Sequence, residues 1–441
     1  MMRVLIFAFA IFFFSGCDQQ TKKADPKILI DQNLLHQNMH QLTEVIIHDV
    51  FSPPVASRIY SYTSLAAYEA LKFEKPGYSS IAAQLNEFAD MPIPEKNKGY
   101  NFLLAATKAF FTVAEKITFS KDSLVQYQNT VFNNFRSLLD KEIFDRSISF
   151  GETVGKKILE RTTADNYKET RGMAKFLGSD EKGKWRPTPP DYLDAAEPHW
   201  GEIKPLLLDS SEQIKCPAPP VYSVEKSSVF FKTVNEVYTI TTTLTEEQRT
   251  IAKYWDDNPF VIEHSGHLMY ANKKITPVGH WIGITTIACK KDDADLLKTA
   301  EAYALTSIAM FDAIISCWSE KYKHQLVRPV TVINELIDGR WQPFLQTPPF
   351  PEHSSGHSGI SASAATILTK LFGDGFTFED TSDYQYIGMK RNFQSFNQAA
   401  QEASISRVYG GIHYRTGVDA GAQQGRQIGE YIINKIKVKT L

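Results

Sequence analysis

The sequence predicts an all-α protein organised as a large bundle of many helices. Apolar residues recur at spacings of three and four along most of the chain, which is the period of a helix buried on one face. Hydrophobic residues make up 43% of the 441 residues, so a large core can be built. One stretch, TVNEVYTITTTL at 233–244, is rich in β-branched residues and is compatible with a strand, although a helical pattern restarts at Thr245.

The expected helices follow from this period in chain order. The first lies within 29–51, and the second lies within 55–73, after the proline pair at 53–54 that is suited to opening a helix. Thr245 is followed three residues later by Gln248, which is the spacing of a capping box. The other helical patterns lie at 100–118, 120–165, 245–257, 293–318, 360–372, 385–409 and 418–436.

The first residues are expected to be an export signal and not part of the fold. Arg3 precedes an apolar run at 4–14 that is too short for a permanent membrane helix and ends in small residues. The sequence FSGC resembles a bacterial lipobox, which implies a signal peptide at 1–16 and lipidation of Cys17; a plain secretory signal or a short anchor are the alternatives. Residues 17–30 are then a flexible tether, and the protein is a membrane-anchored lipoprotein on the periplasmic or cell-surface side.

The rest of the chain is expected to form one compact unit from two helical regions, 31–290 and 291–441. Residues 172–225 are rich in proline, glycine and aromatic residues and are predicted to form a folded loop over one end of the bundle. SLAAYEAL at 64–71 resembles SIAMFDAI at 307–314. This similarity is compatible with two related helical halves, and chance similarity between amphipathic helices is the alternative.

The charge balance excludes some partners. The formal net charge is −2, so no global charge favours nucleic acid, and any anion site must be built from a local cluster of cations. With Cys17 acylated, the spacing of Cys216, Cys289 and Cys317 fits no zinc site. These three cysteines are expected to be buried apolar residues, and a disulfide between two of them is the alternative.

The segment KYKHQLVRP at 321–329 is the first candidate for such a cation cluster. Lys321 and Arg328 are seven residues apart, nearly two helical turns, so both would lie on one face roughly 10 Å apart and converge on one oxyanion. Pro329 disfavours helix at Arg328, which places this arginine where the helix ends. A solvated basic face is the alternative.

The segment PPFPEHSSGHSG at 348–359 is the second candidate, because a helical pattern follows it. Backbone N–H groups at a helix start are unpaired and bind anions. Gly356 allows close approach of the backbone, and Ser355 can donate its hydroxyl. His357 can supply or take a proton near neutral pH. An ordinary capping loop is the alternative.

The segment SRVYGGIHYRTGVDAG at 406–421 is the third candidate. Arg407 and His413 are six residues apart and would point to different sides of a continuous helix. Gly410 and Gly411 permit a break between them, after which both side chains can face one pocket. A helix–helix turn with an incidental histidine is the alternative.

Together, in this order, K-x6-RP, SGH and SR-x5-H resemble the signature of the superfamily of type 2 phosphatidic acid phosphatases (PAP2) and vanadium haloperoxidases. The motifs lie within 290–435, and the long helical region before them is similar to the bacterial vanadium-dependent haloperoxidase branch. The resemblance implies a helical bundle of the vanadium chloroperoxidase and acid phosphatase type. It also implies an enzyme that oxidises a halide with hydrogen peroxide at a histidine-bound vanadate.

In that superfamily one pocket holds vanadate or phosphate. The resemblance implies that His413 is the axial group, which bonds vanadium or attacks phosphorus, and that His357 is the acid–base partner. Three cations, one hydroxyl and one backbone N–H would then bind the oxygens, from Lys321, Arg328, Arg407, Ser355 and Gly356. The aromatic residues Trp318 and Phe350 resemble the halide side of chloroperoxidase-type members.

The chain departs from the pattern at one position that matters for chemistry. The family has an aspartate four residues after the histidine of the third motif, where this chain has Gly417, and the nearest acid is Asp419. That aspartate orients the histidine, which a nucleophilic histidine needs more than a metal-bound one. The gap therefore favours the haloperoxidase over the alternative, a cofactor-free acid phosphatase that cleaves a phosphate ester through a phosphohistidine at His413. A surface lipoprotein that kept the pocket and lost the chemistry is the third hypothesis.

Overall fold

The computed structural model describes residues 31, 33–88, 90–259, 261–265, 268–271 and 274–439. These residues contain fifteen α-helices and two small antiparallel hairpins, so the all-α expectation is confirmed. The predicted signal peptide, the tether and Cys17 lie outside the described residues.

Side chains cap two of the N-terminal helices, α2 at Ser52 and α3 at Asn101. Ser52 caps α2, with Pro53 in its first turn as expected, and the predicted helical stretch at 120–165 is two helices, α4 and α5. The helices of this region are α1 (Asn33–His48), α2 (Pro53–Leu71), α3 (Phe102–Ile117), α4 (Lys121–Leu138), α5 (Lys141–Thr162) and the short α6 (Tyr167–Thr170).

The C-terminal elements follow a long irregular segment. Residues 233–244 fall mostly within helix α7, so the strand alternative for this stretch is wrong, and the capping box of Thr245 and Gln248 is confirmed at the start of α8. The elements are α7 (Val229–Thr242), α8 (Glu246–Tyr254), β1 (Ile262–Ser265), β2 (Leu268–Ala271), α9 (Pro277–Lys291), α10 (Leu296–His324), α11 (Pro329–Leu336), α12 (Gly356–Phe372), β3 (Phe378–Asp380), α13 (Tyr384–Ile387), β4 (Arg391–Phe393), α14 (Phe396–Tyr409) and α15 (Arg415–Lys435).

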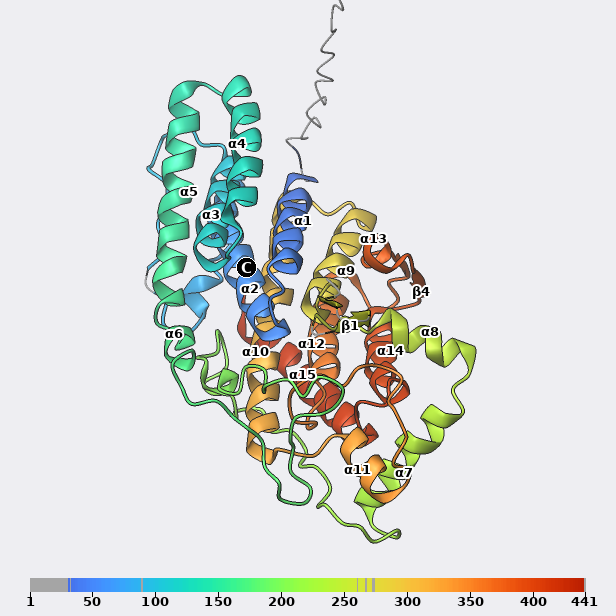
Figure 1. The fold of residues 1–441 in the computed structure, drawn as a ribbon. Helices are drawn as coiled ribbons and strands as arrows, with labels where there is room; N and C mark the ends of the chain where they lie inside the picture. The colour runs from blue at the N-terminus through green and yellow to red at the C-terminus, as the bar shows by residue number, and fades with distance from the viewer. Residues whose placement is uncertain are drawn as a thin grey trace, which may run out of the picture.

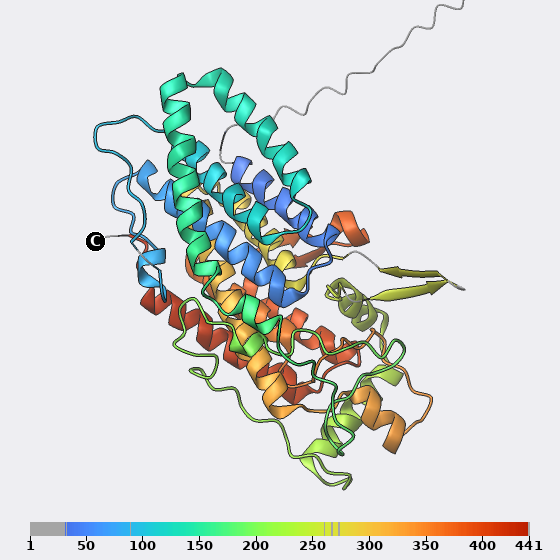
Figure 2. The ribbon, with the colours of Figure 1, turned by 60° about the vertical axis from the view of Figure 1, so that its left-hand side comes forward.

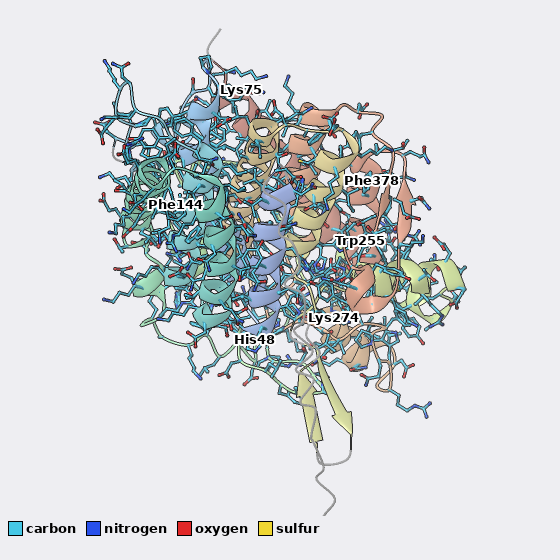
Figure 3. All side chains as sticks on the ribbon, turned by 90° about the horizontal axis from the view of Figure 1, so that it is seen from above. His48, Lys75, Phe144, Trp255, Lys274 and Phe378 are labelled. Carbon is cyan, nitrogen blue, oxygen red and sulfur yellow. The ribbon has the colours of Figure 1, made fainter. Side chains whose placement is uncertain are left out.

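Helix α10 is the centre of the bundle. It packs against α2 on one side and against α12 on the other; α3 and α5 cover α2, whereas α14 and α15 cover α12 (Figure 1). By length and composition α10 could cross a membrane, but 94% of its most apolar 18 residues is buried inside the protein. The view from above separates Phe144 on α5 from Trp255 and Phe378 on the opposite side (Figure 3). The two strands β1 and β2 pair with Ile262 opposite Ala271 and project away from the bundle (Figure 2).

The two similar octapeptides lie on α2 and α10, which pack against each other. Each carries a buried acid at the same place, and each acid accepts hydrogen bonds from a loop. Glu69 accepts from the backbone N–H of Ala82 at 2.8 Å, and Asp312 accepts from the backbone N–H groups of Leu206, Leu207 and Leu208 at 2.7–3.0 Å. The sequence similarity therefore corresponds to a shared structural role.

The irregular segment between α6 and α7 crosses one end of the bundle (Figure 1). Its backbone is hydrogen-bonded to two parts of the chain that carry candidate site residues. The N–H of Trp185 donates to the carbonyl of Gln325 at 2.7 Å, and the N–H of Ala196 donates to the carbonyl of Pro349 at 2.8 Å. Among the described residues Cys216, Cys289 and Cys317 are free, so no disulfide joins them.

Buried His36 predicts acid destabilisation of the fold. Burial, helped by Lys290 and opposed by Asp31, lowers the pKa of His36 to about 4. Below pH 6.5 this histidine is protonated in the unfolded chain but stays neutral in the folded chain. The free energy of unfolding therefore falls as the pH drops from 6.5 towards 4, by about 3 kcal/mol for this group. Urea unfolding at pH 7.5 and 4.5 should show a smaller loss for His36→Gln than for the wild type. Equal losses in the two proteins would contradict this assignment.

Candidate active site

Lys321 and Arg328 come together by a turn and not along one helix. Helix α10 ends at His324, and Gln325 adopts a left-handed conformation (φ 53°) that redirects the chain. Arg328 is extended and precedes Pro329, the first residue of α11. The expectation of one continuous helical face from 321 to 328 is therefore wrong, because the chain leaves the helix four residues before Arg328.

Arg328 is fully buried and held in a fixed orientation. Its Nε donates to the carbonyl of Phe350 at 2.8 Å, and its Nη1 donates to the carbonyl of Ile412 at 2.7 Å. Nη1 also lies 3.2 Å from Nε2 of His413. Its Nη2 is buried with no hydrogen-bond partner among the described residues. An unpaired donor on a buried cation is costly, so Nη2 is suited to an acceptor oxygen that the chain itself does not supply.

Lys321 lies behind the segment that precedes α12. Its Nζ donates to the carbonyls of Pro351 and Glu352 at 3.1 Å and to that of Ser354 at 2.5 Å. All three ammonium donors are therefore directed to backbone oxygens. The positive charge remains close to the candidate site, whereas direct contact of Lys321 with an oxyanion stays a prediction.

Helix α12 begins inside the SGH motif, four residues earlier than the periodicity indicated. Ser355 is its N-cap and accepts a hydrogen bond from the backbone N–H of Ser358 at 3.3 Å. Gly356 and His357 are the first two helical residues, whose N–H groups have no acceptor within the helix. A Cβ on Gly356 would lie 3.3 Å from the ring of Trp318, so glycine lets the indole pack against the helix start.

Arg407 and His357 lie side by side at the helix start. The Nη1 of Arg407 lies 3.1 Å from Nε2 of His357, and the guanidinium also donates to the carbonyls of Trp255 and Asp256 at 2.5 and 3.3 Å. The segment after α8 therefore orients this arginine, a role that the sequence did not reveal. His280 in turn holds that segment through Asp257, at 3.0 Å.

The third motif contains the predicted break. Helix α14 ends at Tyr409, Gly411 has a φ of 75°, and α15 begins at Arg415, so the prediction of a glycine break is confirmed. The turn brings His413 back towards Arg328. Its Nδ1 lies 2.7 Å from Oε1 of Glu352, which is fully buried and also accepts from the N–H of Tyr414 at 3.0 Å.

Glu352 takes the place of the aspartate that the family pattern has at position 417. A Cβ added to Gly417 would lie only 2.4 Å from Oε1 of Glu352, so the glycine provides the space that this carboxylate fills. Asp419, the nearest acid in the third motif, is exposed on α15 and lines a different pocket from His413. It therefore does not orient this histidine, because a residue six positions after His413 lies on a different side of the helix that starts at 415.

Some of these residues line a small cavity of about 30 Å³, whereas Lys321, Arg328, Glu352 and Ser355 do not line it. His357, Arg407 and His413 line it together with Trp318 and Phe350, whose ring centroids are 5.1 Å apart. The cavity is sized for a small ion and not for an organic molecule. Its lining consists of Pro53, Asp257, Asn258, Pro259, Pro277, Trp318, Pro348, Phe350, Gly356, His357, Ile360, Arg407, Ile412 and His413.

The electrostatics of the cavity favour an anion and a neutral histidine. Burial lowers the pKa of His413 well below its usual value, and Arg328 and Lys321 lower it further. Burial and then Arg407 do the same for the pKa of His357. Burial raises the pKa of the Glu352 carboxyl, and the neighbouring cations only partly offset this. With Glu352 accepting from Nδ1–H, the Nε2 atom of His413 is unprotonated, and its lone pair faces Nη1 of Arg328 at 3.2 Å.

The residues present fit vanadate. Three buried cations balance the charge of a tetrahedral oxyanion, the unpaired Nη2 of Arg328 has no other use, and the first N–H groups of α12 are free to donate. The neutral Nε2 of His413 is a suitable metal ligand, with Glu352 fixing the tautomer as carboxylates do at metal-bound histidines. The individual roles predicted for Ser355, Trp318 and Phe350 stay predictions.

Sequence reasoning missed Glu352, although the residue lies in the segment singled out for its polar groups, five positions before His357. Two signals together could have found it: an acid beside the second motif, and glycine at the position of the family aspartate. Neither signal reveals which backbone turn brings the two positions together.

The chain is similar to known proteins both in sequence and in structure. Residues 301–439 match the family model described as the VCPO second helical-bundle domain. The structure is similar to the crystal structure of the first bacterial vanadium-dependent iodoperoxidase, with 43% sequence identity and a TM-score of 0.89 over 94% of this chain and 99% of that chain. No curated protein sequence matches.

Two more distant structures share the fold alone. The holo form of a bacterial vanadium-dependent chloroperoxidase has 17% identity and a TM-score of 0.68 over 88% of this chain and 93% of that chain. The apo form has 16% identity and a TM-score of 0.65 over 87% of this chain and 94% of that chain. On the 43% identity over almost the whole length of both chains, together with the three motifs, this chain belongs to the vanadium-dependent haloperoxidases of the PAP2 superfamily.

Proposed function

We propose that the protein is a vanadium-dependent haloperoxidase that uses hydrogen peroxide to oxidise a halide, with release of hypohalous acid and water. The observation that carries this proposal is the position of His413, which lines the cavity with Arg407 and lies against the buried Arg328 while Glu352 holds its Nδ1. Vanadate, when bound, supplies the Lewis acidity that activates the peroxide.

Different side chains of the site bind the cofactor, stabilise negative charge and transfer the proton. His413 would hold the cofactor through Nε2, and Glu352 fixes the ring in the tautomer that leaves this atom unprotonated. Arg328 and Arg407 stabilise negative charge without having to reorganise, because backbone carbonyls already fix both guanidinium groups. His357, with Nε2 at the cavity, moves the proton that the reaction consumes.

Iodide is the halide that we propose, because the similar structure with 43% identity is an iodoperoxidase. Purified protein reconstituted with orthovanadate should form triiodide from iodide and hydrogen peroxide, and chloride should give no product. The same protein without vanadate and the His413→Ala variant are the controls. A rate that does not depend on vanadate, or equal rates with chloride and iodide, would contradict the proposal.

A phosphatase on the same site is a second candidate, favoured by one observation. The pair of Glu352 and His413 supplies the oriented, basic histidine that a phosphohistidine mechanism needs, so the lack of an acid at Gly417 no longer argues against it. Vanadate separates the two activities, because it should inhibit hydrolysis of nitrophenyl phosphate and activate iodide oxidation. The cavity of about 30 Å³ favours the haloperoxidase, since it has little room for an ester.

We further propose that the protein is exported and attached to a membrane through lipidated Cys17, on the support of the FSGC motif and the preceding apolar run. Expression of the full chain in a bacterium should place the protein in the membrane fraction with a mass that includes the lipid. The Cys17→Ser variant should lose both. An unchanged distribution of the variant would rule out this anchor.

A further inference from the structure

A second cluster of ligand-type side chains lies near Lys321, and none of its three residues lines the cavity. Glu320 and His324 are one turn apart on α10, with Oε2 and Nε2 3.0 Å from each other. His353, from the segment before α12, places its ring at right angles to that of His324 with centroids 5.3 Å apart. One nitrogen or oxygen from each of the three residues lies within 4.8 Å of the other two.

One buried nitrogen of this cluster has no partner among the described residues. His353 is fully buried, and its Nδ1 has no hydrogen-bond partner among the described residues. Its Nε2 contacts Sγ of Cys216 at 3.7 Å, and the ring is also hydrogen-bonded to the backbone of Pro217. A buried histidine with an unpaired ring nitrogen is costly, so the cluster lacks a partner that a bound group would provide.

We infer that Glu320, His324 and His353 form a binding site for a divalent transition-metal cation of the Zn²⁺ class. Two imidazoles and one carboxylate are a donor set that Zn²⁺ takes at sites with an open fourth position. Ligands of a tetrahedral zinc ion lie roughly 3.4 Å apart, so the three side chains need only a small contraction around an ion. The His324 side chain is 26% exposed, which leaves an entry path and a position for water.

The site is separate from the oxyanion cavity but shares its backbone. Glu320 precedes Lys321 on α10, and consecutive helical residues point about 100° apart, so the carboxylate and the ammonium face different sides. His353 follows Glu352, which holds His413, and precedes Ser354, whose carbonyl accepts from Lys321. A bound cation would therefore fix the segment that positions both residues.

Zinc binding to the full chain, freed of metal with a chelator and kept without vanadate, tests this inference directly. Calorimetry and metal analysis should give one Zn²⁺ per chain, and zinc should raise the thermal unfolding midpoint. His324→Ala should lower the affinity at least tenfold and remove the midpoint shift, since it deletes one of three ligands. Glu320→Gln keeps the size of the side chain and should give the same loss, which guards against misfolding of a single variant.

A matched control is available on α1. His40 and Glu44 form the same one-turn pair, with the two side chains 3.9 Å apart. Neither belongs to a group of side chains that could hold a metal ion among the described residues. His40→Ala should therefore leave zinc binding unchanged. Failure of the wild type to bind zinc at micromolar concentration would overturn the inference. Binding that survives His324→Ala but is lost in Cys216→Ser would overturn it as well, by assigning the ion to the thiol. None of these measurements depends on peroxide chemistry.

Discussion

Replacement of His357 with alanine is expected to lower the turnover number of the vanadate-loaded enzyme by about 100- to 10,000-fold, the usual contribution of a positioned acid–base group. The reason is the placement of Nε2, which faces the cavity 3.1 Å from Arg407, on a helix start that holds the ring in place. Burial and Arg407 keep the pKa of His357 well below its usual value in the anion-free protein. The ring is therefore neutral near pH 7 in the anion-free protein, and a negative charge bound beside it would raise this pKa and favour uptake of a proton.

The affinity for vanadate distinguishes proton transfer from simple anion binding. It should change much less than turnover in His357→Ala, because the buried cations and His413 remain. Titration with orthovanadate, followed by tryptophan fluorescence from Trp318, measures the affinity, and iodide oxidation measures turnover. His199→Ala, which removes a half-exposed histidine paired with Glu202 outside the cavity, is the control. Parallel loss of affinity and turnover would make His357 a binding residue instead.

Replacement of Glu352 with alanine is expected to weaken vanadate binding and turnover by about 10- to 100-fold each, the range found for carboxylates that orient a metal-bound histidine. The variant loses the 2.7 Å contact with Nδ1 of His413, so the ring is free to turn and to change tautomer. Equilibrium titration with vanadate and steady-state kinetics with iodide measure the two effects.

A second substitution, at Gly417, should partly restore what Glu352→Ala removes. Since a Cβ at position 417 would enter the space occupied by the Glu352 carboxylate, Gly417→Asp alone should destabilise the site. In the double variant Glu352→Ala with Gly417→Asp, the same space is free, and an aspartate can approach Nδ1 of His413 from α15. Activity should therefore recover at least partly in the double variant. Two losses that simply add would show that position 417 cannot supply the carboxylate.

The sequence determined the helical class, most helix positions and the three motifs of the site. Apolar periodicity, proline positions and capping residues act over a few neighbours, so they can be interpreted without the fold. The break at Gly410 and Gly411 is one example. Glycine adopts a positive φ without steric cost, and Gly411 has a φ of 75° at this turn. The order of the motifs was enough to identify the superfamily.

Only the tertiary structure decided which groups orient the site residues, because these groups come from distant parts of the chain. Glu352 and His413 are 61 residues apart, and the carboxylate reaches the ring because Gly417 leaves space for it. The carbonyls that hold Arg407 come from a segment about 150 residues earlier. Such partners depend on how closely two backbones approach, which is set by packing of the whole bundle and leaves no periodic pattern in the sequence.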